Sequence, residues 1–253
     1  RNEGWASQRT ADIACRVGAL PTFLTVTGDQ INASSSAYAQ VVVQGEVGNP
    51  IGGTRQDRRI YGSIAGRAGY LWKDTSDITR FYATEASETG TPTPTPGVQM
   101  FTPDVGDMFD GIVTVASGGN DSWSDSMSVQ HIVATHRAIL NRAHSTSAQI
   151  LIMTVPLSES YPPETGPGDK RIELNDMIAR EFPAHVVDMR AHLMSDAGAA
   201  DAGITLTSDD QTDIANGLTP RQMRSDSVHF NEYGASAVAA LLHREMVARG
   251  WVI

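Results

Sequence analysis

The chain has few lysines, a single cysteine and no long apolar run. Lys73 and Lys170 are its two lysines, and the formal net charge is −10, so no basic stripe is present that could follow a phosphate backbone. With one cysteine the chain has no disulfide framework, and we expect Cys15 to be a small buried side chain. No stretch approaches the roughly twenty apolar residues that span a bilayer. We therefore expect neither a nucleic acid partner nor a membrane span.

Histidines and acids also fail to cluster at metal-ligand spacing. His131 and His136 lie in one expected helix but are not at i and i+4, the spacing of a helical zinc pair. We expect His136, on the apolar face of that helix, to be a core or boundary residue. The sequence predicts no metal and no other cofactor, and gives little support to a metal-dependent deacetylase.

Apolar strands alternate with amphipathic helices in the C-terminal part of the chain. Residues 149–155 form a near-continuous apolar run, which is typical of a parallel strand covered on both faces. Helices are expected at residues 127–143 and 170–182, and another strand at 185–189. This alternation favours βαβ units and a parallel sheet. The acidic segment 196–222 is expected to be a loop across the mouth of a cleft.

Residues 22–106 have a different pattern. Short alternating runs are separated by Gly, Pro, Asn and Ser, which predicts a small antiparallel β unit. Aromatic residues of this unit could stack on sugar rings, or could be core and cross-strand partners. Both interpretations stay open for Tyr61, Tyr70, Trp72, Phe81 and Tyr82.

A polar loop near the C-terminus places Asp226 three residues before His229, just ahead of an expected helix. Imidazole titrates close to neutral pH and can move a proton to and from a hydroxyl, and a neighbouring carboxylate orients it. Short polar residues are also expected before a helix simply because they cap its free N–H groups. The pair is therefore a candidate catalytic dyad or an ordinary capping sequence.

A second polar stretch follows the expected strand at residues 113–116. This strand stops in Gly118, Gly119, Asn120 and Asp121, which places a side-chain amide at the carboxyl end of a sheet, where open α/β sheets bind ligands. The alternative is a plain turn, since Gly, Asn and Asp are common turn residues.

Together these two stretches resemble the SGNH (GDSL-type) hydrolases, and the segment from Asn2 to Thr10 resembles the second conserved block of that family. The resemblance implies a flavodoxin-like three-layer α/β fold with a parallel sheet and, here, an inserted antiparallel β unit. The expected divisions are 1–21, the first part of the α/β domain; 22–106, the insertion; and 107–253, the remainder.

The resemblance also implies the roles of individual residues. Asp226 would orient His229, the general base, and Asn120 would donate to the oxyanion together with the backbone N–H near Ser7. Substrate would contact Gly119, Asp121 and Trp123.

Two departures from the family pattern are present. Ser7 stands where the family usually has glycine, and the Gly-Asp-Ser nucleophile block is missing. In the family that block precedes the second block, so we expect the nucleophilic serine upstream of residue 1.

Two functions follow from these observations. The first is a serine esterase that hydrolyses acyl esters, with an acylated carbohydrate as the expected substrate. The second is a catalytically inactive binding or structural module of a phage tail, virion or cell surface. Either function implies an extracellular or virion-associated protein, with other virion proteins or further copies of the chain as possible partners.

Overall fold

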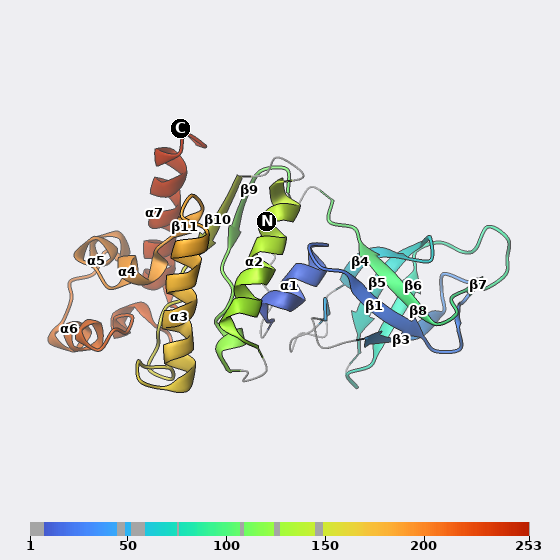
Figure 1. The fold of residues 1–253 in the computed structure, drawn as a ribbon, viewed down its shortest axis with the longest axis horizontal. Coiled ribbons are helices and arrows are strands. Elements are labelled where there is room, and N and C mark those ends of the chain that lie inside the picture. Colours follow the sequence, from blue (N-terminus) through green and yellow to red (C-terminus); the bar gives the residue numbers. More distant parts are fainter. Residues whose placement is uncertain are drawn as a thin grey trace. The chain divides into compact units, whose positions relative to one another are not determined.

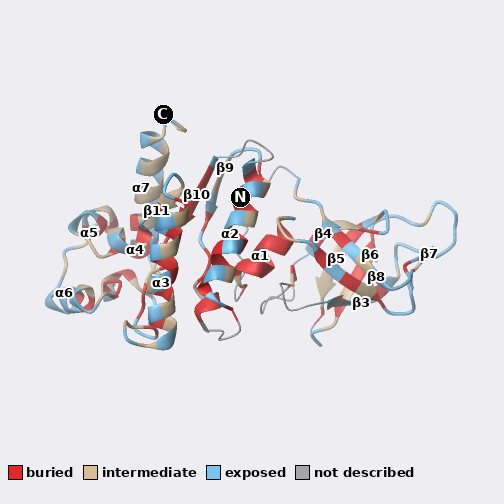
Figure 2. Ribbon diagram, viewed as in Figure 1, coloured by how far each residue is buried: buried red, intermediate tan, exposed pale blue. Residues whose placement is uncertain are grey.

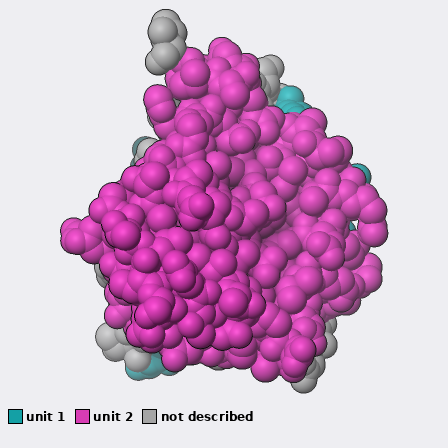
Figure 3. All heavy atoms as spheres, turned by 90° about the vertical axis from the view of Figure 1, so that its left-hand side faces the viewer, with its two compact units in different colours: residues 1–111, 134–147 teal, residues 112–133, 148–253 magenta. Residues whose placement is uncertain are grey.

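A computed structural model describes residues 8–44, 49–51, 59–74, 76–106, 109–123, 127–144 and 149–252. The chain divides into two compact units (Figures 1 and 3). Unit 1 contains residues 1–111 and 134–147, and unit 2 contains residues 112–133 and 148–253. The boundary passes through helix α2 (Val129–His144), and each unit is described by itself.

Unit 1 contains a closed barrel of antiparallel strands. Around the barrel the strands follow in the order β1 (Thr22–Val26), β3 (Tyr38–Gln44), β6 (Thr79–Ala83), β5 (Arg67–Lys73), β4 (Arg59–Ile64) and β8 (Val98–Pro103). Buried and exposed residues alternate along the barrel strands (Figure 2). The buried side chains form one cluster that includes Leu24, Leu71, Phe81 and Phe101. Closure pairs the outermost strands β1 and β8, so the barrel has no open sheet edge.

Unit 1 also contains a short helix and a two-stranded ribbon. The ribbon pairs β2 (Gln30–Ile31) with β7 (Thr93–Pro94). In helix α1 (Thr10–Arg16) the buried Asp12 carboxylate accepts hydrogen bonds from the backbone N–H of Arg9, at 2.9 Å, and of Asn49, at 2.7 Å. Cys15 is fully buried, as predicted, and burial raises the pKa of its thiol to about 11.

Unit 2 is built on a small parallel sheet with the strand order β11-β10-β9. Its strands are β9 (Ile112–Val115), β10 (Gln149–Met153) and β11 (Val186–Val187). Its further helices are α3 (Gly166–Glu181), α4 (Met189–Leu193), α5 (Asp196–Ala202), α6 (Ser208–Ala215) and α7 (Glu232–Ala248), with 3₁₀ turns η1 (Asn120–Trp123) and η2 (Arg221–Met223). Side chains of β10 and β11 share a buried cluster with α4, α5 and α7. No described helix is long and apolar enough to cross a membrane.

The expectation of a flavodoxin-like three-layer α/β fold is wrong. The described residues form only a three-stranded parallel sheet, in which β11 has two residues, while the larger sheet is the six-stranded barrel of unit 1. Hydrophobic periodicity does find the apolar strands, but it reports local burial. The number of strands that pair in one sheet depends on segments far apart in sequence, which periodicity does not describe.

The acidic segment 196–222 is also not a plain loop. It contains the helices α5 and α6, and each begins at a capping residue. Ser195 accepts from the N–H of Gly198, and Thr207 accepts from the N–H of Asp210. Thr207 and Asp210 form a capping box, in which the Asp210 carboxylate accepts from the N–H of Thr207 in return. A threonine three residues before an acidic residue is a sequence signal for the start of a helix, and it could have predicted the start of α6.

Candidate functional site

The first part of the candidate site is the turn that follows strand β9. Gly118 has a φ of +105°, and a Cβ added there would lie 2.5 Å from the Leu174 side chain, so the turn requires glycine. Asn120 then begins η1, and it is exposed. The turn therefore places the Asn120 amide just beyond the carboxyl end of a parallel strand, where α/β proteins bind ligands.

The buried Arg171 of α3 fixes this turn. Its guanidinium donates to the Gly119 carbonyl at 3.1 Å, to the Ser122 hydroxyl at 3.0 Å and to the Pro156 carbonyl at 3.1 Å. It also lies 4.4 Å from the centroid of the Tyr161 ring. Arg171 is only 4 % exposed, and burial lowers its pKa. One cation thus joins the loop after β9 to the loop after β10.

Other contacts fix the rest of the turn through its backbone. The Ser122 hydroxyl donates to the Gly119 carbonyl at 2.6 Å, and the Lys170 ammonium donates to the Asp121 carbonyl at 3.1 Å. Asp121 is fully buried and Gly119 is half-buried, in contrast to the exposed Asn120. Trp123 lies in η1, but its side chain is outside the described part, as is the whole of Ser7.

The second part of the site is the loop that carries Asp226 and His229. His229 Nδ1 lies 2.9 Å from Asp226 Oδ2 and 3.1 Å from Oδ1. Asp226 Oδ1 also accepts from the backbone N–H groups of His229, at 2.8 Å, and Val228, at 2.7 Å. These hydrogen bonds, the one from the His229 N–H first, lower the pKa of Asp226 to about 2.

This arrangement determines which imidazole nitrogen is available. With its pKa at about 2 the Asp226 carboxylate is ionised at neutral pH, so it favours the tautomer with the proton on Nδ1. The His229 side chain is 76 % exposed, and within the described residues nothing hydrogen bonds to Nε2. Nε2 can therefore accept a proton from a group that approaches from solvent.

The base of the loop is closed by the cap of helix α7. The Asn231 side chain accepts from the N–H groups of Tyr233, at 3.0 Å, and Gly234, at 3.2 Å, and donates to the Gln222 carbonyl at 2.8 Å. A Cβ on Gly234 would lie 2.4 Å from the Met223 carbonyl oxygen, so the helix approaches the loop at a distance that only glycine permits. The helix cap and the acid–histidine contact are thus both present in the same loop.

An ion cluster lies under the loop. Arg224 and Asp213 are both nearly buried and form an ion pair at 2.9 Å, and Arg221 pairs with the other Asp213 oxygen at 2.9 Å. Burial by itself would raise the pKa of Asp213, but the two guanidinium groups outweigh burial and lower it. Arg224 also reaches Glu159, at 3.2 Å, which joins this loop to the loop after β10.

Both parts of the site therefore border one segment, residues 156–161. Pro156 accepts from Arg171 on the side of Asn120, and Ser160 donates to Ser227 at 2.8 Å on the side of His229. Sequence reasoning missed Arg171, because nothing in the α3 pattern distinguishes a buried arginine from an exposed one. It also missed the Ser160–Ser227 contact, which joins residues far apart in the chain.

The described residues contain no group of three or more His, Cys, Asp or Glu that could bind a metal ion. They also contain no serine hydroxyl bonded to His229 Nε2, since Ser160 and Ser227 bond to each other and Ser225 contacts backbone carbonyls. What these residues offer chemically is an acid–base pair, open to solvent, and an exposed amide at the end of β9.

Comparisons with known proteins add one distant structural similarity to this description. No family model matches the chain, and no curated protein matches it. Among solved structures it is similar to a chain described as "Peptidoglycan O-acetylesterase in action, 5 min", with a TM-score of 0.36 and 11 % identity. That match covers 91 % of this chain and 77 % of the other.

Proposed function

We propose that unit 2 provides the acid–base and oxyanion-binding groups of a serine esterase that hydrolyses acyl esters. One observation carries the proposal. The His229 imidazole is bonded through Nδ1 to a carboxylate that stays ionised down to about pH 2, and its Nε2 is open to solvent. A carboxylate–imidazole pair in this orientation is what a hydroxyl nucleophile needs as its base.

In the proposed reaction the nucleophile is a serine on a segment that precedes residue 1. His229 Nε2 takes the hydroxyl proton as the serine oxygen attacks the acyl carbon, and Asp226 stabilises the imidazolium that forms. The Asn120 amide donates to the oxyanion. The tetrahedral intermediate then expels the alcohol, which receives the proton from His229. Water, deprotonated by the same imidazole, hydrolyses the acyl-enzyme and regenerates the serine.

Substrate class and location are part of the proposal. We infer an acylated carbohydrate as the substrate and an extracellular or virion-associated protein. Gly119, Asp121 and Trp123 would lie nearest the substrate on the Asn120 side. The buried Asp121 would act through the shape of the turn, whereas the exposed Asn120 would contact the acyl group directly.

The second candidate is a binding or structural module that carries the dyad without a nucleophile. It is favoured by the contacts of the described serines, none of which donates to His229 Nε2. In that function Asp226 and His229 would only stabilise the loop that caps α7. The two candidates differ in one measurable property, which is the presence of an activated serine.

The test uses the natural full-length protein, treated with a fluorophosphonate and assayed with p-nitrophenyl acetate. The esterase proposal expects one covalent adduct by intact mass, and loss of both adduct and turnover in His229→Gln. Asn120→Ala should reduce turnover roughly 100- to 1,000-fold, as the loss of one oxyanion donor does elsewhere.

A matched control is His243→Gln, which changes an exposed histidine on α7, the helix that follows the loop. It should leave labelling and turnover unchanged. An unlabelled wild-type protein without turnover would favour the binding module. Normal turnover in Asn120→Ala would remove Asn120 from the mechanism.

A further inference from the structure

A continuous row of tyrosines crosses the outer face of the barrel in unit 1. Tyr38 of β3, Tyr82 of β6, Tyr70 of β5 and Tyr61 of β4 are direct partners across three successive strand pairs. Neighbouring ring centroids in this row are 5.6, 5.2 and 5.5 Å apart. Because residues on one face of a strand alternate with residues on the other, the whole row points away from the buried core.

The inner rings of this row pack on each other. Tyr70 and Tyr82 are stacked at an interplanar angle of 11°, and the guanidinium of Arg59 lies 4.6 Å from the Tyr70 centroid. Cross-strand aromatic pairs of this kind stabilise a sheet. The row also forms a rigid ridge, and Tyr61 at its end is 48 % exposed.

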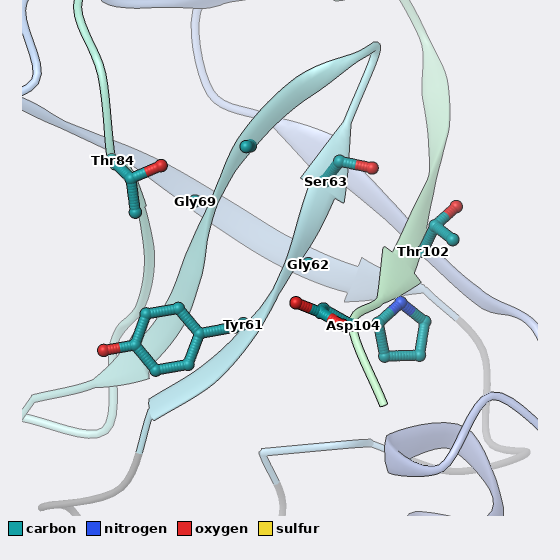
Figure 4. Close-up of a pocket in the computed structure, with 9 residues that line it drawn as sticks. Tyr61, Gly62, Ser63, Gly69, Thr84, Thr102 and Asp104 are labelled. Carbon is teal, nitrogen blue, oxygen red and sulfur yellow. The ribbon is translucent and has the colours of Figure 1, made fainter. Parts of the chain in front are cut away.

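Beside the ridge lies a parallel row of short side chains. Ala68, Ser63 and Thr84 each lie two residues from a tyrosine of the row, Tyr70, Tyr61 and Tyr82 respectively, and Thr102 of β8 continues this second row. Ser63 is the direct partner of both Ala68 and Thr102, and the Thr84 N–H donates to the Ala68 carbonyl at 3.0 Å. Short side chains next to tall rings leave a hollow of about 350 Å³, at the lower end of the range for ligand pockets (Figure 4). We call this hollow the tyrosine groove.

Glycines make the base of the tyrosine groove rigid. Gly62 and Gly69 are cross-strand partners, and a Cβ on Gly62 would lie 2.5 Å from the Phe101 ring. A Cβ on Gly69 would lie 2.4 Å from the Phe81 ring. The two core phenylalanines therefore pack directly against the strands beneath the groove, so the groove is formed by the fold before any ligand binds.

The chemistry of the lining selects a class of ligand. Hydroxyls come from Ser63, Thr84 and Thr102, an aromatic ring from Tyr61 and a carboxylate from Asp104 (Figure 4). None of the described lining residues is basic. One Asp104 oxygen accepts from the Gly106 N–H at 3.0 Å, which leaves the other available to a hydroxyl donor. A ligand with a phosphate or a uronate group would be repelled by this carboxylate and by the chain's net charge of −10.

We propose that the tyrosine groove binds a neutral saccharide chain laid across the strands. Sugar hydroxyls would exchange hydrogen bonds with the three side-chain hydroxyls and donate to Asp104, while an apolar face of one sugar ring packs on Tyr61. The groove runs from Thr84, just after β6, across the strands β5, β4 and β8, so several consecutive sugars can be in contact with it. This site lies within unit 1 and does not depend on the ester hydrolysis proposed for unit 2.

The experiment measures binding of the full chain by isothermal titration calorimetry at millimolar ligand. The probes are three neutral hexasaccharides, cellohexaose, chitohexaose and mannohexaose, and one anionic hexasaccharide, hexagalacturonate. We expect at least one neutral probe to bind, and to bind more tightly than hexagalacturonate.

Two variants test the location of the site. Ala68→Gln places a long side chain in the groove, and Tyr61→Ala removes the exposed ring at its end. Each should weaken binding about tenfold or more, corresponding to about 1.4 kcal/mol. Both positions are exposed, so the barrel should stay folded, which circular dichroism checks.

The control is Phe23→Ala. Phe23 is an aromatic residue of similar exposure on β1, the strand that lies across the barrel from β5 in the strand order. It should leave binding unchanged. The proposal fails if no neutral hexasaccharide binds, if hexagalacturonate binds best, or if Ala68→Gln and Tyr61→Ala bind as tightly as Phe23→Ala.

Discussion

Replacement of Arg171 by methionine tests how the turn that carries Asn120 is fixed. The change keeps an unbranched side chain but removes all three hydrogen bonds of the guanidinium, to Gly119, Ser122 and Pro156. A buried acceptor that loses its donor costs about 1–3 kcal/mol. Since two of the three bonds are only partly buried, where water can replace the donor, we expect the unfolding free energy of unit 2 to fall by about 3–5 kcal/mol.

The measurement is hydrogen exchange followed by mass spectrometry, because the two units need not unfold together. Arg171→Met should speed exchange in η1 and β10 of unit 2 and leave exchange in the barrel strands unchanged. Arg180→Met is the control on the same helix, where the guanidinium is 67 % exposed and pairs with its neighbour Glu181. An exposed pair of this kind contributes at most about 1 kcal/mol.

The reasoning is refuted if Arg171→Met and Arg180→Met exchange equally in η1. It is also refuted if the effect of Arg171→Met spreads evenly over both units. Arg171→Lys should be intermediate, because a single ammonium cannot reach three acceptors in the geometry of a planar guanidinium.

Two further predictions concern the same unit. Gly118→Ala should destabilise unit 2 by about 1–3 kcal/mol in a urea titration, because a φ of +105° strains any other residue and the new Cβ would contact Leu174. Gly111→Ala is the control, since Gly111 has no positive φ and nothing lies within 4 Å of an added Cβ, and it should leave the urea midpoint unchanged. Equal midpoints for the two variants would contradict this account. The Asp226 carboxyl should titrate at about pH 2 by ¹³C NMR, below its usual 3.8. Because the folded pKa is lowered, the contribution of Asp226 to stability is complete above pH 3.8 and disappears as the pH falls through about 2. A midpoint near 3.8 would show that the bonds from His229 and Val228 do not persist in solution.

Local features of the fold and of the site could be predicted from the sequence. The apolar run at 149–155 predicted a strand and contains β10, and the amphipathic pattern at 127–143 predicted a helix and covers all of α2 except its last residue. Asp226 and His229 are three residues apart in a loop closed by the Asn231 cap, so backbone geometry alone brings their side chains together. Such features depend on interactions between residues that are close together in the sequence.

Tertiary structure determined the rest. The six strands of the barrel have the same alternating pattern as the strands of an open sheet, and only the pairing of β1 with β8 closes them. The expectation of a three-layer fold was wrong because the described residues pair only three strands in the parallel sheet of unit 2. Three of the tyrosines were left as either core or surface residues by the sequence, and the strand register places them, with Tyr38, in one outward row.

The amino-acid sequence by itself determined the local elements, the capping residues and the acid–histidine pair, because each depends on interactions between residues close in the chain. The tertiary structure alone decided the buried position of Arg171, the closure of the barrel and the groove beside its tyrosines. Each of these joins residues that are distant in sequence, and burial and register are properties of the assembled fold.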